Sequence, residues 1–163
     1  MMDIKNEPYQ TSLDHLAELP DLLDQELGLS PWTEITQEQI TTFAQITGDE
    51  QWIHVDVARA REESPYGTTI AHGFMILSLA SKFAYETMHI GDVGMGLNYG
   101  LDKVRFMNAT PAGAKVRGRI SLMAYEPIEN GAKYKIKIIF ELQGQEKPAC
   151  VAEFLAHAYT AKK

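Results

Sequence analysis

The order of the elements predicted along the chain indicates the α+β class, with an antiparallel sheet curled around one long helix. Residues 73–88 are apolar nearly all round, a pattern typical of a helix that its surroundings bury. Strand-like segments follow it to the end of the chain, over residues 96–106, 114–125, 133–142 and 149–159. In the third of these, apolar residues alternate with lysines, which is typical of an antiparallel sheet with one solvated face.

The first part of the chain is expected to contribute a helix, a strand and a second helix. Leucines recur at mostly helical spacing over residues 12–25, where Pro20 must interrupt the pattern or begin a turn, so we expect a short N-terminal helix or extension. Residues 32–35 alternate apolar with polar side chains and predict a short strand. Thr36 followed by Gln39 is a capping-box pattern, which predicts a helix that runs to about residue 47.

The segment after this second helix is predicted to be irregular. Gly48 stands where a left-handed cap would end a helix, and residues 49–54 follow without a regular pattern. Asp56 can cap a short helix over residues 57–63, which a turn at residues 64–67 ends. The side chains of residues 49–54 are therefore expected to lie in a loop between two helices.

Length and composition predict one domain and exclude several classes of protein. The 163 residues fit a single domain, 1–163, in which residues 1–30 form an extension packed on the rest. The net charge of -7 has the wrong sign for binding nucleic acid, and no apolar stretch approaches the length of a membrane span. The single cysteine, Cys150, cannot form an internal disulfide and lies in a strand pattern, so we expect it to pack in the core of a cytoplasmic protein.

Asp49 and His54 are the candidate acid-base pair. They stand five positions apart in the predicted loop, which can turn both side chains toward one water molecule. On spacing alone the pair is weak evidence, because Asp49 could equally cap a turn while His54 packs with one nitrogen hydrogen-bonded. Gly73, at the start of the long helix, leaves backbone N–H groups able to stabilise an oxyanion. There the alternative is a glycine required by packing, with His72 as a buried polar residue.

Several separate motifs stand in an order that resembles one family. They are FAQITGDEQWIHVD at 43–56, SPYG at 64–67, IAHGF at 70–74 and NYGLDKVRF at 98–106. Together they resemble the MaoC-like dehydratases, or (R)-specific enoyl-CoA hydratases, and in particular the nodulation protein N-like branch. The resemblance covers residues 27–160. It departs from the family at large where Gln51 and Trp52 replace an Asn-Pro pair, a change that alters the rigidity of the loop and puts the substrate preference in doubt.

The resemblance implies a hot-dog fold, in which an antiparallel sheet wraps a long helix, and a homodimer of two such sheets. It also implies the hydration of trans-2-enoyl-CoA to (R)-3-hydroxyacyl-CoA, or the reverse dehydration, with no metal and no redox cofactor. The family's catalytic aspartate and histidine map onto Asp49 and His54, and its oxyanion donor maps onto Gly73. The expected substrate is an acyl thioester of coenzyme A or of acyl carrier protein, and the residues expected to contact it are Gln51, Trp52, His72 and Phe74.

Two other functions stay open from the sequence. A thioesterase of the same fold would attack the carbonyl carbon and release the thiol, and a non-catalytic module would bind the acyl group without turnover. For the carrier, the basic residues that could contact coenzyme A phosphates are Lys103, Arg105, Lys115 and Arg117, although basic residues on strands more often form a solvated face.

Overall fold

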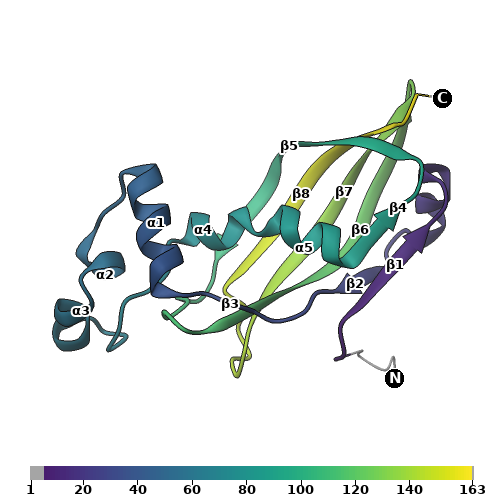
Figure 1. Cartoon of the computed structure of the whole chain (residues 1–163). Helices are drawn as coiled ribbons and strands as arrows, with labels where there is room; N and C mark the ends of the chain where they lie inside the picture. Colours follow the sequence, from purple (N-terminus) through teal and green to yellow (C-terminus); the bar gives the residue numbers. More distant parts are fainter. Residues whose placement is uncertain (1–5, 163) are drawn as a thin grey trace.

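The computed structural model describes residues 6–162, and one sheet of eight strands dominates it (Figure 1). The strands are β1 (Tyr9–Leu13), β2 (Glu26–Leu29), β3 (Thr33–Glu34), β4 (Met88–Ile90), β5 (Val93–Phe106), β6 (Lys115–Ile128), β7 (Gly131–Leu142) and β8 (Cys150–Thr160). Their order is β4-β1-β2-β6-β7-β8-β5, with β3 paired to β6. All pairs are antiparallel except β1 with β4, which is parallel. The antiparallel sheet predicted from the sequence is therefore confirmed, with one short parallel pair at its edge.

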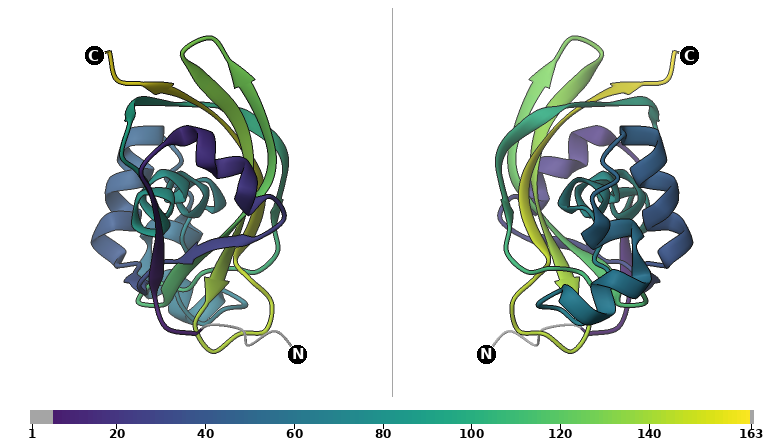
Figure 2. Two further views of the ribbon diagram at one scale, coloured as in Figure 1. Left: turned by 90° about the vertical axis from the view of Figure 1, so that its right-hand side faces the viewer. Right: turned by 90° about the vertical axis from the view of Figure 1, so that its left-hand side faces the viewer.

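The helices are η1 (Leu16–Leu22, a 3-10 helix), α1 (Gln37–Thr47), α2 (Trp52–Val55), α3 (Val57–Glu63), α4 (Gly73–Ser78) and α5 (Ala80–Thr87). The long helix predicted over residues 73–88 is thus two helices in line, separated by a single irregular residue, Leu79. The view along these two helices in Figure 2 shows the sheet curving around them. None of the helices in the described part of the chain is long and apolar enough to cross a membrane.

The core lies between α5 and the concave face of the sheet. Phe83 of α5 is fully buried, and its ring centroid lies 5.8 Å from that of Phe140 on β7. A Cβ atom built on Gly118 of β6 would lie 2.6 Å from the Cβ of Phe83, so only glycine lets the helix approach the sheet this closely. The alternation predicted for β7 is confirmed, because Ile136 and Ile138 are buried on the same face as Phe140.

The sheet covers only one side of the central helix, which corrects the prediction that its surroundings bury it all round. Phe74 is 70% exposed and Tyr85 is 75% exposed, although both are large apolar side chains. The other helices do not complete the enclosure, since α1, α2 and α3 gather at the N-terminal end of α4 (Figure 1). The central helix therefore has apolar side chains that the rest of the chain leaves exposed to solvent.

The short N-terminal helix or extension predicted over residues 12–25 is present as the 3-10 helix η1, which is shorter than that range. It connects β1 to β2, and the two strands pair with each other. Pro20 lies inside η1, where its missing N–H opposes a regular α-helix. The leucines that suggested a helix do reach the core, because Leu16 and Leu19 of η1 are buried against it.

The segment before the central helix follows the sequence pattern closely. The strand predicted at residues 32–35 is present as β3, and Thr36 and Gln39 form the predicted capping box of α1. Gly48 ends α1 with a left-handed φ of 74°. The segment from 49 to 54 is less irregular than predicted, because its last residues begin the single turn of helix α2. Asp56 caps α3 as predicted, accepting a hydrogen bond from the N–H of Arg59.

Candidate active site

His54 lies on α2 and is held so that one of its nitrogens stays available. Its side chain is almost fully buried, and its Nδ1 lies 2.7 Å from the carbonyl oxygen of Ile70. A carbonyl oxygen only accepts hydrogen bonds, so Nδ1 must carry the hydrogen. In the neutral ring Nε2 then carries a lone pair, which is what a general base requires.

Asp49 approaches His54 from the other side of the short loop. Its side chain is about half exposed, at 46%, and its Oδ1 lies 3.4 Å from the amide Nε2 of Gln51. A carboxylate oxygen of Asp49 and a ring nitrogen of His54 lie within 4.8 Å of each other. One water molecule can span that distance with two hydrogen bonds of about 2.8 Å each.

His72 is the third member of the cluster and the most deeply buried, at 4% exposed. Its Nε2 lies 2.8 Å from the backbone carbonyl oxygen of Asp49 and therefore donates to it. Its ring stacks on that of His54, with centroids 3.7 Å apart and planes 24° apart. The ring of Phe43 lies against it with a centroid distance of 5.1 Å. Nδ1 of His72 is buried without a hydrogen-bond partner among the described residues.

A cavity of about 340 Å³ opens beside His54 and Gly73. Its other walls are mostly apolar and come from Tyr66, Ile70, Ala71, Ile76, Phe106, Met107, Asn108, Ala109, Thr110 and Ala149. As the first residue of α4, Gly73 has no acceptor for its N–H within the helix, and no other described residue accepts it. The cavity therefore brings together an imidazole with a free nitrogen and an unpaired backbone N–H.

The structure places the sequence-predicted residues at different depths in this site. Asp49 and His54 have donor atoms within 4.8 Å of each other, Gly73 lines the same cavity as His54, and Gln51 contacts the Asp49 carboxylate. Trp52 is half-buried, and the guanidinium of Arg59 lies 4.3 Å from the centre of its ring. His54 and Gly73 line the cavity, whereas Asp49, Gln51, Trp52, His72 and Phe74 are not among its lining residues.

Several residues of the site were not predicted from the sequence. The carbonyl of Ile70 orients His54, and the ring of Phe106 covers the cavity face of Gly73. Thr110 lines the cavity, and its buried hydroxyl has no hydrogen-bond partner among the described residues. Tyr66 stands in the SPYG turn, which the sequence marked only as the end of a helix and as part of a family motif. The type of residue does not indicate any of these roles in the sequence, because each role arises from contacts between segments that are far apart in the chain.

Asp49, His54 and His72 also form the one group of three possible metal ligands in the described part of the chain. The arrangement of the two rings fits a metal ion poorly. The rings of His54 and His72 are stacked, 3.7 Å apart and 24° from parallel, and are not aimed at a common point, although one nitrogen of each ring has no hydrogen-bond partner among the described residues. The same contacts suit a pair of proton-handling groups, which the resemblance had implied.

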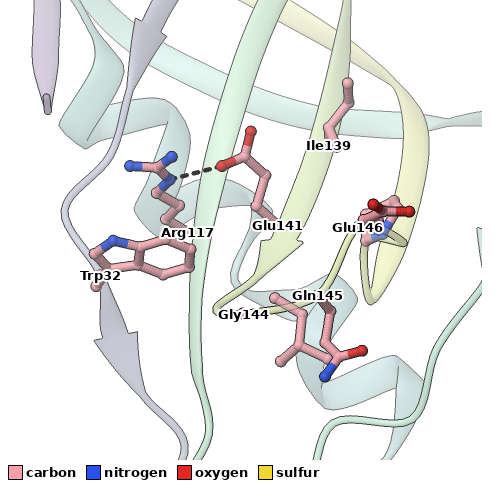
Figure 3. Close-up of a pocket in the computed structure, with 9 residues that line it drawn as sticks. Trp32, Arg117, Ile139, Glu141, Gly144, Gln145 and Glu146 are labelled. Carbon is pink, nitrogen blue, oxygen red and sulfur yellow. Dashed lines mark hydrogen bonds and ion pairs between the residues drawn. The ribbon is translucent and has the colours of Figure 1, made fainter. Parts of the chain in front are cut away.

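A second hollow, of about 490 Å³, lies on the outer face of the sheet, and its lining includes Arg117, which the sequence offered as a phosphate contact. Figure 3 shows Arg117 there, with its guanidinium directed at Glu141 and beside the ring of Trp32. Arg117 is therefore neutralised and nearly buried, which argues against the phosphate contact considered for it. Lys103 is paired with Glu153 at 3.2 Å.

Cys150 packs in the core, as expected from its strand pattern. It is fully buried on the inner face of β8, and burial raises the pKa of its thiol to about 11. A thiol in that state is a poor nucleophile near neutral pH. Cys150 is therefore not a candidate nucleophile, in agreement with its expected packing role.

Comparison with known proteins agrees with this fold. A family model described as "MaoC like domain" matches residues 18–140. The 3-hydroxyacyl-thioester dehydratase Z of Mycobacterium tuberculosis is 43% identical over 143 residues, which cover 87% of this chain and 94% of that protein. Nodulation protein N of Rhizobium leguminosarum bv. viciae is 42% identical over 144 residues, covering 86% and 88% of the two chains. The solved structure of an R-hydratase from Pseudomonas aeruginosa gives a TM-score of 0.71 at 19% identity, over 95% of this chain and 90% of that one.

The sheet that curves around a central helix is a hot-dog fold, like that of the solved R-hydratase, and the relatives named as dehydratases define an enzyme of the hydro-lyase class. The chain belongs to the MaoC-like dehydratase family, because the family model spans residues 18–140 of its 163 residues. The family and the fold predicted from the sequence motifs are therefore confirmed.

Proposed function

We propose that this protein adds water to the double bond of trans-2-enoyl thioesters and removes it from (R)-3-hydroxyacyl thioesters. The observation that carries the proposal is the placement of His54, whose Nδ1 is fixed on Ile70 while Asp49 lies within reach of one shared water. The curated relative named 3-hydroxyacyl-thioester dehydratase Z supports the substrate class, since it is 43% identical over 87% of this chain.

In the proposed reaction, Asp49 and His54 hold the attacking water on the β-carbon of the substrate. The thioester oxygen accepts a hydrogen bond from the N–H of Gly73, which draws electron density away from the conjugated double bond. One of the two side chains takes a proton from the water, and the other delivers a proton to the α-carbon. The two roles exchange in the reverse reaction, because dehydration passes through the same transition state.

The acyl group is proposed to occupy the cavity beside His54 and Gly73. Its walls are largely apolar, with Ile76, Met107 and Ala149 among them, as an acyl chain requires. The carrier is proposed to be coenzyme A or acyl carrier protein. Both belong to the cytoplasm, where a chain with one free, buried cysteine fits.

The test is the hydration of crotonyl-CoA, followed by the loss of ultraviolet absorbance of its conjugated double bond. Asp49→Asn and His54→Gln should each lower kcat by about a hundredfold or more, which is the usual scale of lost acid-base catalysis. His89→Gln is the matched control, because His89 is an exposed histidine of β4. Rates like those of the wild type in both site variants would contradict the proposal.

The same assay separates the two alternative functions. A thioesterase would release free thiol from saturated acyl-CoA and would not need the double bond. A non-catalytic module would be stabilised by acyl-CoA against thermal unfolding without consuming it. The proposal requires double-bond consumption, an (R)-configured product and no thiol release.

We also propose that the protein is a homodimer that uses β5. This strand lies at the edge of the sheet, and nearly all of its 14 residues are exposed. Its apolar side chains include Met95, which is 50% exposed, and Leu97, which is 47% exposed. β5 pairs with β8 on one side only, and the open edge of a long apolar strand is a template for pairing with another chain. A second copy of the protein supplies a strand of matching length.

A further inference from the structure

We propose that His72 is a positioning residue that holds Asp49 and His54 in their reactive arrangement. The inference rests on the proposed function above, because it assigns a supporting role within that site. His72 is 4% exposed, its Nε2 donates to the backbone of Asp49 and its ring stacks on His54, so its contacts act on these two residues and not on the substrate. This role replaces the direct substrate contact expected for it from the sequence.

The first part of the role is the hydrogen bond to the backbone of Asp49. Nε2 of His72 donates to the Asp49 carbonyl over 2.8 Å. Asp49 directly follows the left-handed Gly48 at the end of α1, and its side chain is only half buried. Few other contacts restrain it, since the Asp49 N–H reaches only the hydroxyl of Thr47, at 3.4 Å. The hydrogen bond from His72 is therefore the shorter of the two polar contacts to the backbone of Asp49, and it fixes the position of the backbone from which the Asp49 side chain extends.

The second part of the role is the stacking of the His72 ring on that of His54. Nδ1 of His54 is held by Ile70, but one hydrogen bond leaves a ring free to swing about that bond. The His72 ring lies 3.7 Å from it and 24° from parallel, and Phe43 packs against His72 in turn. The stack therefore sets the plane of His54 and with it the direction of the Nε2 lone pair.

The cost of this arrangement is visible at the other nitrogen of His72. When Nε2 carries the hydrogen, Nδ1 is an acceptor, and it is buried with no partner among the described residues. An apolar ring would avoid that penalty but could not donate to Asp49. A glutamine could donate but could not stack. Only a flat ring with one donor nitrogen can both donate to the Asp49 carbonyl and stack on His54. Glutamine keeps the donor alone and phenylalanine keeps the ring alone, so two substitutions test the two contacts separately.

The test uses His72→Gln, which keeps a donor for the Asp49 carbonyl, and His72→Phe, which keeps the flat ring. Each should lower kcat for crotonyl-CoA hydration by about tenfold, and His72→Ala by about a hundredfold, because small displacements of reacting groups have effects of this size. KM should change by less than about threefold in all three. His157→Gln is the matched control, since His157 also stacks on a ring, that of Tyr99 at 4.3 Å, but lies outside the site on β8.

Histidine tautomers, measured by long-range proton–nitrogen NMR on the full-length protein, give a readout independent of activity. In the wild type, neutral His72 should carry its hydrogen on Nε2 and neutral His54 on Nδ1. The His54 hydrogen should stay on Nδ1 in both His72→Phe and His72→Gln, because the Ile70 carbonyl still accepts it, so a fall in kcat in these variants reports displaced groups and not a changed tautomer. A wild-type His72 with its hydrogen on Nδ1 would overturn the inference, whether or not the variants fold.

The outcomes also separate this inference from the function on which it rests. If Asp49→Asn and His54→Gln are inactive while all His72 variants keep the wild-type kcat, the positioning role fails and the proposed function stands. If the Asp49 and His54 variants keep full activity, the proposed function itself fails. A raised KM with unchanged kcat in the His72 variants would make His72 a substrate contact, which also overturns the inference.

Discussion

Gly73 has to satisfy packing and chemistry at the same position. A Cβ atom built on it would lie 2.9 Å from the ring of Phe106, and the proposed oxyanion donor is its own N–H. Its backbone is ordinary for any residue, since its φ is not positive, so the contact with Phe106 is what excludes a side chain. The alternative reading of this glycine from the sequence, as a packing residue, therefore holds together with the proposed chemical one.

Gly73→Ala is expected to lower the free energy of unfolding by about 1–2 kcal/mol, because the added methyl must displace the Phe106 ring. The ring also lines the cavity, so kcat should fall as well. Urea unfolding of the variant, alone and combined with Phe106→Ala, measures the effect. The penalty of Gly73→Ala should shrink in the Phe106→Ala background, where the clash is absent. An equal penalty in both backgrounds would show that the ring is not the cause.

At this scale the sequence supplied candidates for the reacting groups, which stay a prediction, but not the residues that support them. The spacing of Asp49 and His54 was weak evidence by itself, and the family motifs around the pair strengthened it. The partners that orient these side chains come from elsewhere in the chain, such as the Ile70 carbonyl. Backbone carbonyls carry no residue-specific signal, and a stack between His54 and His72 depends on how two helices meet. Such supports become visible only in three dimensions.

A ladder of charges joins three strands on the outer face of the sheet. Arg119 of β6 contacts both carboxylate oxygens of Glu26 on β2 at 2.9 Å, and its Nε contacts Glu141 of β7 at 2.6 Å. Arg117 contacts the other oxygen of Glu141 at 2.7 Å. Burial acts to raise the pKa of the Glu141 carboxyl, but the hydrogen bonds and charges of the two arginines outweigh burial and hold its pKa below the ordinary value.

Glu141→Gln is expected to lower the free energy of unfolding near neutral pH by about 2 kcal/mol, because it leaves the largely buried Arg117 beside a neutral amide and removes one of the carboxylates that contact Arg119. A carboxyl whose pKa is lower in the folded state stabilises the fold above its unfolded pKa, and this contribution disappears as the pH falls through the folded pKa. The wild type should therefore lose more stability than Glu141→Gln between about pH 5 and pH 3. Urea unfolding across that range makes the comparison.

The control for this prediction is Glu63→Gln, which removes the partner of Arg59 on α3. Both side chains of that pair are about half exposed, so the change should cost no more than about 0.5 kcal/mol. Parallel pH profiles for the wild type and Glu141→Gln would mean that the ladder does not stabilise the fold through Glu141.

At the scale of elements, the sequence predicted correctly the strands with strictly alternating residues and the helices with a capping motif. The alternation of β7 and the capping box of α1 were both confirmed, because each is decided by residues close in sequence. Over residues 12–25 the regular helical spacing exceeded the helix that forms, the 3-10 helix η1. Leu13 of β1 and Leu16 and Leu19 of η1 pack on one core, and a pattern set by tertiary contacts can imitate a longer helical period.

At the scale of the whole molecule, we propose that residues 1–163 fold as one domain. The N-terminal segment supplies β1 and β2 to the same sheet as the later strands, and Leu27 and Leu29 of β2 are fully buried. Thermal unfolding of the full-length protein should accordingly show a single transition, since no part of the sheet forms a core of its own. This arrangement also explains why the central helix is open on one side, because its own chain provides only one curved sheet.

The proposed dimer places a second copy against β5, and the charge of that edge decides whether it forms. The double variant Met95→Lys and Leu97→Lys adds two like charges to each copy, so pairing would bring four lysines together, and the protein should become monomeric. Sedimentation velocity or light scattering measures the mass. Ile46→Lys is the matched control, because Ile46 is 77% exposed on α1 and a charge there should leave the dimer intact. A wild-type protein that is monomeric at micromolar concentration, or a double variant that stays dimeric, would rule out β5 as the interface.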